Sequence, residues 1–237
     1  MYGGSSGCYG IVLYNTKIEG DNAVFGYYNG EDICLKTGTL EAMKALKDSM
    51  DEDVPRASNT GRSLVVMFLV YIAAVVAGFI MLPLNVAFAL LLFCVGSYFP
   101  LLVIIGARAG LFKDPELRDQ FRRYHGCEHA AMNALSEKKP AEMKTFEKPQ
   151  IYDPECGTAY SGYAVTLAIE LALLVIFWPG LLKAVAILLL TGIVQVVMIL
   201  IPRINPFVIL QRPVVLPPTE REYLLAIEIM KKLRELE

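Results

Sequence analysis

The chain has 237 residues, of which 55% are hydrophobic and 19% charged, and its mean hydropathy is +0.46. This composition excludes an ordinary soluble globular protein and predicts a membrane protein. The formal net charge of −2, with basic residues beside apolar spans rather than in one patch, argues against a nucleic-acid partner.

The cysteines predict a reducing environment. They are Cys8, Cys34, Cys94, Cys127 and Cys156, an odd number at irregular spacing without a Cys-x-x-Cys pair. No disulfide framework is therefore expected. The start of the chain, MYGGSSG, lacks the basic leader and apolar core of a cleavable signal peptide, so we expect the internal spans to drive membrane insertion.

Residues 1–60 are polar enough to form a small cytosolic domain. Three short strands are predicted, at 10–16, 22–28 and 31–36. Asn29-Gly30 is a typical hairpin turn, and Thr39 then caps a helix with apolar residues on one face. We expect a β-rich domain with an appended amphipathic helix and no catalytic chemistry within it.

Segment 61–107 predicts a first transmembrane hairpin. Ranges 64–82 and 84–106 contain no charged residue and meet at Pro83. Each is long enough to cross about 30 Å of hydrocarbon at about 1.5 Å per residue. Pro100 should kink the second helix, because its ring removes an amide donor and clashes with the preceding turn.

Segment 161–201 predicts a second hairpin, because it is too long for one span and is broken at Trp178-Pro179-Gly180. Nine Lys or Arg lie in 107–160 and Arg62 precedes the first span, whereas ranges 64–82 and 84–106 contain none and segment 161–201 contains only Lys183. The positive-inside rule then places both termini and the central segment in the cytoplasm. The predicted fold is an α-helical polytopic protein of the cytoplasmic (inner) membrane, with four transmembrane helices in two hairpins and a small cytosolic α+β N-terminal domain.

The central segment, 108–160, should contain one long helix. Asp114-Pro115-Glu116 has the features of a helix start, and the helix should run to about Glu137 and stop before Pro140. Gly126 in its middle costs about 1 kcal/mol relative to alanine. A close approach of another backbone or a substrate would explain this glycine, and plain helix packing would explain it nearly as well.

This helix carries His125 and His129, the only histidines of the chain, and Glu128. Residues four apart share one helix face, so both imidazoles can reach one metal ion. The pattern His-x-x-Glu-His is the inverted metalloprotease motif, in which the glutamate is a base toward water and not a ligand. The alternative is that the two histidines cap or pair at a membrane surface without metal.

Two histidines leave tetrahedral zinc short of ligands, and the best downstream donors are Asp153 and Cys156. If Asp153 alone joins, the site stays open and can be catalytic. If Cys156 joins as a fourth ligand, the site is closed and structural. Asp153 could instead orient one of the histidines through its second ring nitrogen.

The run Arg123-Tyr124-His125-Gly126-Cys127-Glu128-His129, followed by Cys156-Gly157-Thr158, resembles the YqhQ-type prokaryotic membrane-protein family. Tyr2-Gly3-Gly4 and the stretch 210–233 are also similar. The family is described only as predicted metal-dependent enzymes, so the resemblance implies a metal site. The family has histidine where this chain has Asp153, which implies that Asp153 is the third ligand.

Two further features complete the chain. Glu170 lies within the third span, where a lone carboxylate is either functional or a protonated partner of Thr191 or Gln195. In the tail, 202–237, Thr219-x-x-Glu222 predicts a capping box on an amphipathic helix that packs on the cytosolic domain.

We therefore expect a membrane-embedded zinc-dependent hydrolase, foremost a metallopeptidase, with one zinc per chain. His125, His129 and Asp153 would hold the metal, and Glu128 would be the catalytic base. The bilayer and a membrane-protein or peptide substrate would be its partners. The competing hypothesis is a non-enzymatic membrane-protein assembly or quality-control factor with a structural zinc site.

Overall fold

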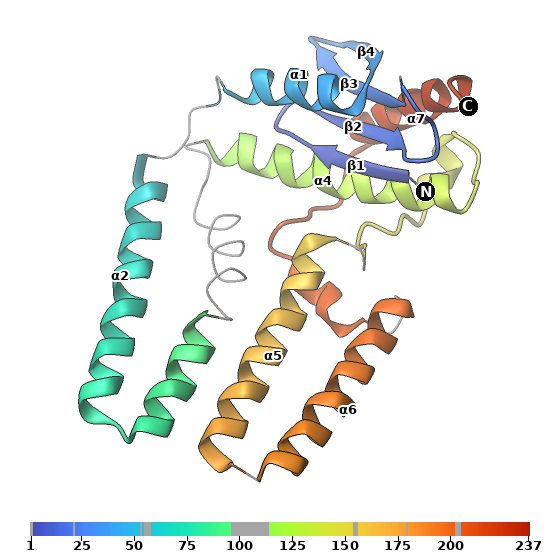
Figure 1. Cartoon of the computed structure of the whole chain (residues 1–237). Coiled ribbons are helices and arrows are strands. Elements are labelled where there is room, and N and C mark those ends of the chain that lie inside the picture. Colours follow the sequence, from blue (N-terminus) through green and yellow to red (C-terminus); the bar gives the residue numbers. More distant parts are fainter. Residues whose placement is uncertain are drawn as a thin grey trace. The chain divides into compact units, whose positions relative to one another are not determined.

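The structure is a computed structural model that describes residues 2–20, 22–52, 54, 58–95, 114–153, 156–178, 180–201 and 205–237. The chain divides into two compact units. The first unit combines Met1–Ala57, Gly110–Asp153 and Pro213–Glu237, and the second combines Ser58–Ala109 and Pro154–Arg212. Each unit is therefore built from segments that are distant in the sequence (Figure 1).

The first unit contains one antiparallel sheet in the order β1-β2-β3-β4. Its strands are β1 (Tyr2–Ser6), β2 (Gly10–Asn15), β3 (Ala23–Asn29) and β4 (Asp32–Gly38). The three predicted strands are confirmed to within two residues at each end. Strand β1 was not predicted, because its Gly-Gly-Ser-Ser run has little intrinsic preference for a strand.

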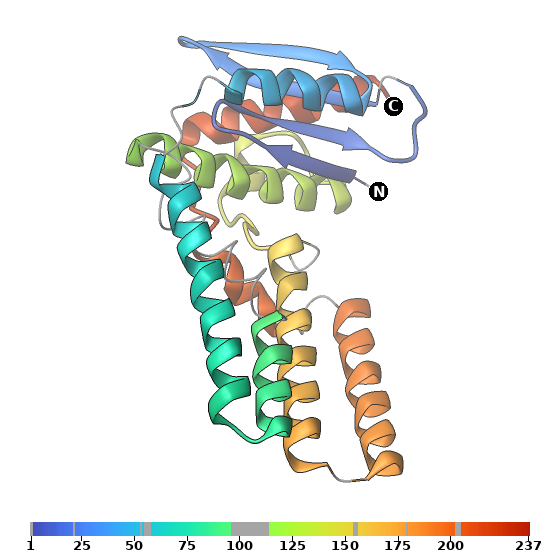
Figure 2. The ribbon, with the colours of Figure 1, turned by 60° about the vertical axis from the view of Figure 1, so that its left-hand side comes forward.

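The two faces of this sheet bury different helices. Helix α1 (Leu40–Glu52) packs through Met43 against Val12, Ala23 and Phe25 on one face. Helices α4 (Pro115–Ser136) and α7 (Glu220–Glu235) pack against Ile11, Leu13 and Val24 on the other face. The alternation of side chains along β2 and β3 produces these two cores. Figure 2 shows α1 and α7 on opposite sides of the sheet.

The ends of these helices follow the sequence signals. Asp114 accepts a hydrogen bond from the Glu116 amide at 2.8 Å, and α4 ends one residue before Glu137. A capping box of Thr219 and Glu222 opens α7, which packs on the sheet as expected. A short 3-10 helix, η1 (Met143–Phe146), lies between α4 and the end of this segment.

The second unit contains helical hairpins. Helix α2 (Ser58–Met81) and the helix Leu84–Val95 meet at Pro83, and their Phe79 and Phe88 rings lie 5.2 Å apart. Helices α5 (Gly157–Phe177) and α6 (Leu181–Leu200) meet at Trp178 and Gly180, and η3 (Pro206–Gln211) follows them. Both predicted breaks are confirmed. The predicted kink at Pro100 lies outside the described residues.

One helix of the described chain is long and apolar enough to cross a membrane, over the 18 residues Leu181–Met198. Shorter apolar helices cover Phe68–Met81, Leu84–Val95 and Ser161–Phe177. The fold is thus mostly helical with a small N-terminal sheet and one candidate span.

Candidate metal centre

His125 and His129 lie one helical turn apart on α4. Their ring centroids are 4.5 Å apart, and the rings are inclined at 66°. A ligand nitrogen of each ring lies within 4.8 Å of the other. The spacing that the motif predicted has therefore brought two imidazoles together at one place on the helix.

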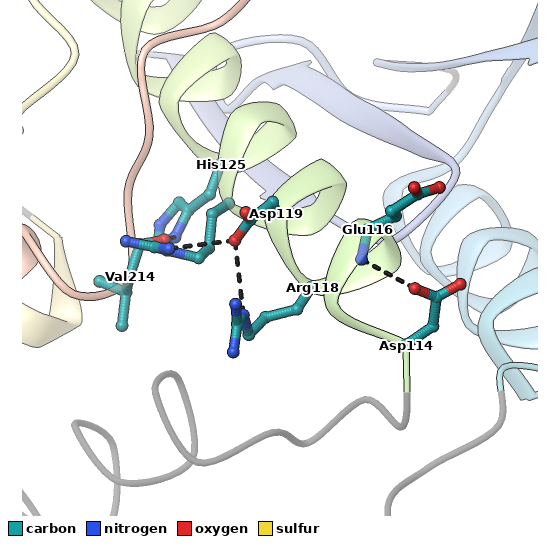
Figure 3. A network of polar contacts seen from close by, with 7 residues as sticks. Asp114, Glu116, Arg118, Asp119, His125 and Val214 are labelled. Carbon is teal, nitrogen blue, oxygen red and sulfur yellow. Dashed lines mark hydrogen bonds and ion pairs between the residues drawn. The ribbon is translucent and has the colours of Figure 1, made fainter.

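Backbone carbonyl groups hold both rings in place. His129 Nδ1 lies 2.9 Å from the carbonyl oxygen of Ile151, and His125 Nδ1 lies 3.3 Å from that of Val214. A carbonyl can only accept, so in each neutral ring Nδ1 carries the proton and donates it, and the lone pair is on Nε2. Figure 3 shows His125 beside Val214. Histidine ligands of metals are typically anchored in this way through the other ring nitrogen.

The surroundings keep both histidines neutral. Burial, together with the neighbouring His129, lowers the pKa of His125 to about 3, and the opposing effects of Val214 and Asp153 are smaller. Burial likewise lowers the pKa of His129 to about 4, opposed by its bond to Ile151. Neutral imidazole is the form that binds metal, so both side chains are in that form at pH 7.

The segment that contains Val214 and Leu216 packs directly on helix α4. The amide of Leu216 donates to the carbonyl oxygen of Arg122 at 3.0 Å. A Cβ atom on Gly126 would lie 2.3 Å from the Leu216 oxygen, which no real side chain permits. Gly126 is therefore explained by the close approach of another backbone, one of the explanations left open by the sequence.

Polar contacts also order the first turns of α4. Asp119 accepts from Arg118 at 3.4 Å and from Arg122 at 3.1 Å (Figure 3). Arg118, Arg122, His125 and His129 are spaced by four, three and four residues, so they lie along one side of the helix. Positive charge therefore borders the histidine pair on its N-terminal side.

Glu128 is buried, with 7% of its surface exposed. It lies against β1, where a Cβ atom on Gly4 would be 2.6 Å from its Oε1, and its side chain forms a hydrogen bond with Ser6. Residues 1–60 were expected to contain no catalytic chemistry, and the contacts of Gly4 and Ser6 with Glu128 were not predicted. The sequence signal was Tyr2-Gly3-Gly4, because only glycine leaves space for this carboxylate.

Burial raises the pKa of Glu128 to about 7. Asp153 also raises it, whereas the bond to Ser6 and the charges of Lys47 and Lys44 lower it. A carboxylate with a pKa near the working pH is suited to accept and return a proton.

The charge of Asp153 raises the pKa of both His125 and Glu128, but its carboxylate does not lie within 4.8 Å of both histidine nitrogens. Only 7% of its surface is exposed. The Nδ1 atoms of both histidines already bond to backbone carbonyls, so Asp153 is not needed to orient either ring through that atom. A role for Asp153 as a ligand remains a prediction.

The two cysteines nearest to the motif differ. Cys127 is fully buried and donates to the carbonyl oxygen of Glu222 in α7 at 3.0 Å, so it points away from the histidines. Cys156 precedes α5 in the second unit. It lies three positions after Asp153 in the sequence, so their Cα atoms cannot be more than about 11 Å apart. Cys156 stays a predicted fourth ligand.

Glu170 has a partner within its own hairpin. The hydroxyl of Thr191 lies 2.5 Å from Glu170 Oε1 and also hydrogen-bonds its own helix at Ile187. This is the cross-hairpin bond that the structural interpretation of Glu170 predicted, and it favours that interpretation.

The described chain therefore combines a mostly helical fold, a small N-terminal sheet, one helix long and apolar enough to cross a membrane, and a candidate metal centre. A family model described as "Protein of unknown function (DUF1385)" matches residues 33–210, so the chain belongs to that family. This agrees with the resemblance to an uncharacterised family that the sequence indicated. No curated protein and no solved structure matches the chain.

Proposed function

We propose that the protein is a membrane-embedded zinc-dependent hydrolase, and specifically a metallopeptidase that acts at the cytosolic membrane interface. The observation that carries the proposal is the arrangement on α4. Two neutral imidazoles are anchored through Nδ1, and Glu128 beside them is buried with a pKa of about 7. Imidazoles with a carboxylate suit zinc better than magnesium or calcium, which prefer oxygen ligands.

His125, His129 and Asp153 would hold one zinc ion per chain. Three protein ligands leave one tetrahedral position open, as in catalytic zinc sites. A zinc ion held there would supply Lewis acidity toward the carbonyl group of a substrate.

Glu128 would carry the proton of the reaction. As the oxygen of water bonds to the peptide carbonyl carbon, the Glu128 carboxylate accepts a proton from that water. When the C–N bond breaks, the carboxyl group returns the proton to the departing amine nitrogen. General acid–base catalysis of this kind contributes about 10²- to 10⁴-fold to the rate.

The membrane arrangement is the four-span one, with two hairpins and both termini in the cytoplasm. Apolar side chains exposed on the second unit support contact with lipid, for example Ile80 at 78% and Leu182 at 84% exposure. The partners would then be the bilayer and a membrane-protein or peptide substrate, with no nucleic acid.

A second candidate is a non-enzymatic assembly or quality-control factor with a closed structural zinc site. Cys156 would then join His125, His129 and Asp153 as the fourth ligand. Four protein ligands would leave no position for water.

Glu128→Gln separates the two candidates, because it removes the base and leaves the predicted ligands in place. We expect the purified variant to keep about one zinc per chain and to lose hydrolysis of a fluorogenic peptide pool by at least about 100-fold. Glu116→Gln, an exposed carboxylate in the first turn of the same helix, is the matched control. A zinc-loaded wild-type protein without hydrolytic activity would favour the structural candidate.

A further inference from the structure

Strand β1 forms one edge of the sheet. Among the described residues, no other strand pairs with its outer side. Tyr2, Gly4, Ser5 and Ser6 of this strand are partly exposed. An edge strand presents backbone N–H and C=O groups, with which a further extended chain can pair.

The hairpin between β1 and β2 defines which groups point outward. The amide of Gly7 donates to the carbonyl oxygen of Gly10 at 2.9 Å, so this pair bonds across the ladder. Ser6 lies opposite Ile11 and Ser5 opposite Val12. Because bonded and non-bonded pairs alternate in an antiparallel ladder, Ser5 and Gly3 bond to β2. The backbone groups of Gly4 and Ser6 therefore point to the outer edge.

The pairing of β2 with β3 leads to the same assignment of outward-pointing groups on β1. Asn15 donates to the carbonyl oxygen of Asn22 at 3.0 Å, so the odd-numbered residues of β2 bond to β3 and the even-numbered ones to β1. Leu13, opposite Gly4, therefore does not bond to β1.

Gly4 and Ser6 also face the candidate site. Their cross-strand partners, Leu13 and Ile11, belong to the core shared with α4. The carboxylate of Glu128 occupies the space that a side chain at residue 4 would fill. Both views show α4 beside β1 (Figures 1 and 2). The carboxylate thus lies against the strand residues whose backbone groups point outward.

We propose that the outer edge of β1 is the substrate-docking edge, where an extended peptide segment pairs with the backbone of Gly4 and Ser6. This inference rests on the peptidase function proposed above and names its substrate class. Adjacent strands lie about 4.7–4.9 Å apart, so the peptide backbone opposite Gly4 is brought beside Glu128. The carbonyl of Ser6 already accepts a bond from Lys47 at 3.4 Å, so Gly4 N–H, Gly4 C=O and Ser6 N–H provide the main contacts.

Because the proposed contacts are all to the peptide backbone, they select substrates by backbone conformation and not by side-chain sequence. A helical segment has its N–H and C=O groups bonded internally and cannot pair with β1. The substrates are therefore extended or unfolded polypeptide segments, and intact transmembrane helices are excluded as substrates.

Hydrogen exchange of the full-length Glu128→Gln variant, loaded with zinc and in detergent, tests this proposal. The probe is a millimolar pool of random hexapeptides that are acetylated and amidated at their ends. We expect the amides of Gly4 and Ser6 to exchange at least about tenfold more slowly with the pool present. The amides of Gly3 and Ser5, already bonded to β2, should not change. Unchanged exchange at Gly4 and Ser6 would overturn the proposal.

The hydrogen-exchange assay tests the docking edge and the hydrolysis assay tests the peptidase, so one proposal can fail while the other stands. Hydrolysis by the wild-type protein without protection at Gly4 and Ser6 would reject only the docking edge. Protection without hydrolysis would reject only the peptidase.

Ser6→Pro and Ser6→Ala form a matched pair in the same assay. Both lose the hydroxyl group, and only proline loses the outward N–H, which an edge strand tolerates. The proline variant should need about threefold to tenfold more peptide for half-protection of Gly4, as expected for one hydrogen bond. Both variants should keep their zinc. Equal peptide requirements for the two variants would contradict the proposal.

Discussion

The backbones of Gly126 and Leu216 are in contact next to His125, because a Cβ atom on Gly126 would lie 2.3 Å from the Leu216 oxygen. The neighbouring Val214 carbonyl holds His125 Nδ1. Any side chain at position 126 must therefore displace the segment that fixes one of the predicted ligands.

We predict that Gly126→Ala weakens zinc binding by about 10- to 100-fold, as the loss of a ligand's supporting hydrogen bond typically does. By helix propensity alone, the same substitution would stabilise α4 by about 1 kcal/mol, so weaker zinc binding would come from the displaced segment and not from a weaker helix. Competition with a chromogenic chelator measures the zinc affinity. Gly192→Ala is the control, since open space surrounds Gly192 within α6. Unchanged affinity in the Gly126 variant would show that the segment does not support His125.

The ligand assignment predicts an order among three variants. Asp153→Ala should lower zinc content about as severely as His129→Ala, and Asp153→His should restore much of it, because imidazole binds at nearly the same metal distance. Cys156→Ser should retain zinc. Metal analysis of the purified proteins checks this. If Cys156→Ser loses the metal while Asp153→Ala keeps it, the closed structural site is the better description.

We predict that the metal-free protein loses stability as pH falls below about 6.5. Unfolded histidines bind protons there, whereas the folded pKa values of about 3 and 4 keep His125 and His129 neutral. Glu128 opposes this effect, since its folded pKa of about 7 exceeds the ordinary value of 4.5. Between pH 6.5 and 4.5 these three groups bind up to about two protons in the unfolded state and about one in the folded state, so stability falls as pH falls.

Glu128→Gln removes the opposing effect, so its loss of stability over this pH range should be steeper than that of the wild-type protein. Exchange protection of the β2 amides, corrected for the intrinsic pH dependence of exchange, measures the opening of the first unit. A shallower loss in the variant would contradict the assignment of these pKa shifts.

The four-span arrangement predicts the side on which cysteines react. Cys8 and Cys127 are 1% and 0% exposed, so a membrane-impermeant thiol reagent should reach neither in the folded protein. Cys34, partly exposed on β4, should react only from the cytosolic side. Asn85→Cys, at the exposed tip of the first hairpin, should react from outside intact cells. Reaction of Cys34 from outside would refute this topology.

Local signals predicted most of the elements and the centre of the site. Asp114-Pro115, Thr219-x-x-Glu222 and the breaks at Pro83 and Trp178 act over a few residues, and each lies where it was expected. The spacing of His125 and His129 required nothing beyond the period of a helix.

The supporting contacts were not predictable, because they come from segments distant in the sequence. Ile151 and Val214 act through backbone carbonyls, which any residue possesses, so the sequence carries no sign of them. In the sequence, Gly4 is marked only by the resemblance of Tyr2-Gly3-Gly4 to the YqhQ-type family. The Cβ clash with Glu128 that explains it exists only after β1 has packed on α4.

The first unit is built from three separate stretches of chain, and each contributes to the candidate centre: Gly4 and Ser6, then the α4 residues, then Val214. During synthesis at about 5–20 residues per second, β1 emerges roughly 10–40 seconds before Val214 does. Until then His125 lacks its anchoring carbonyl, and β1 can pair only with the strands that follow it. The candidate site is therefore completed only after both helical hairpins have been made, and a metal held as proposed would be bound late in the synthesis of each chain.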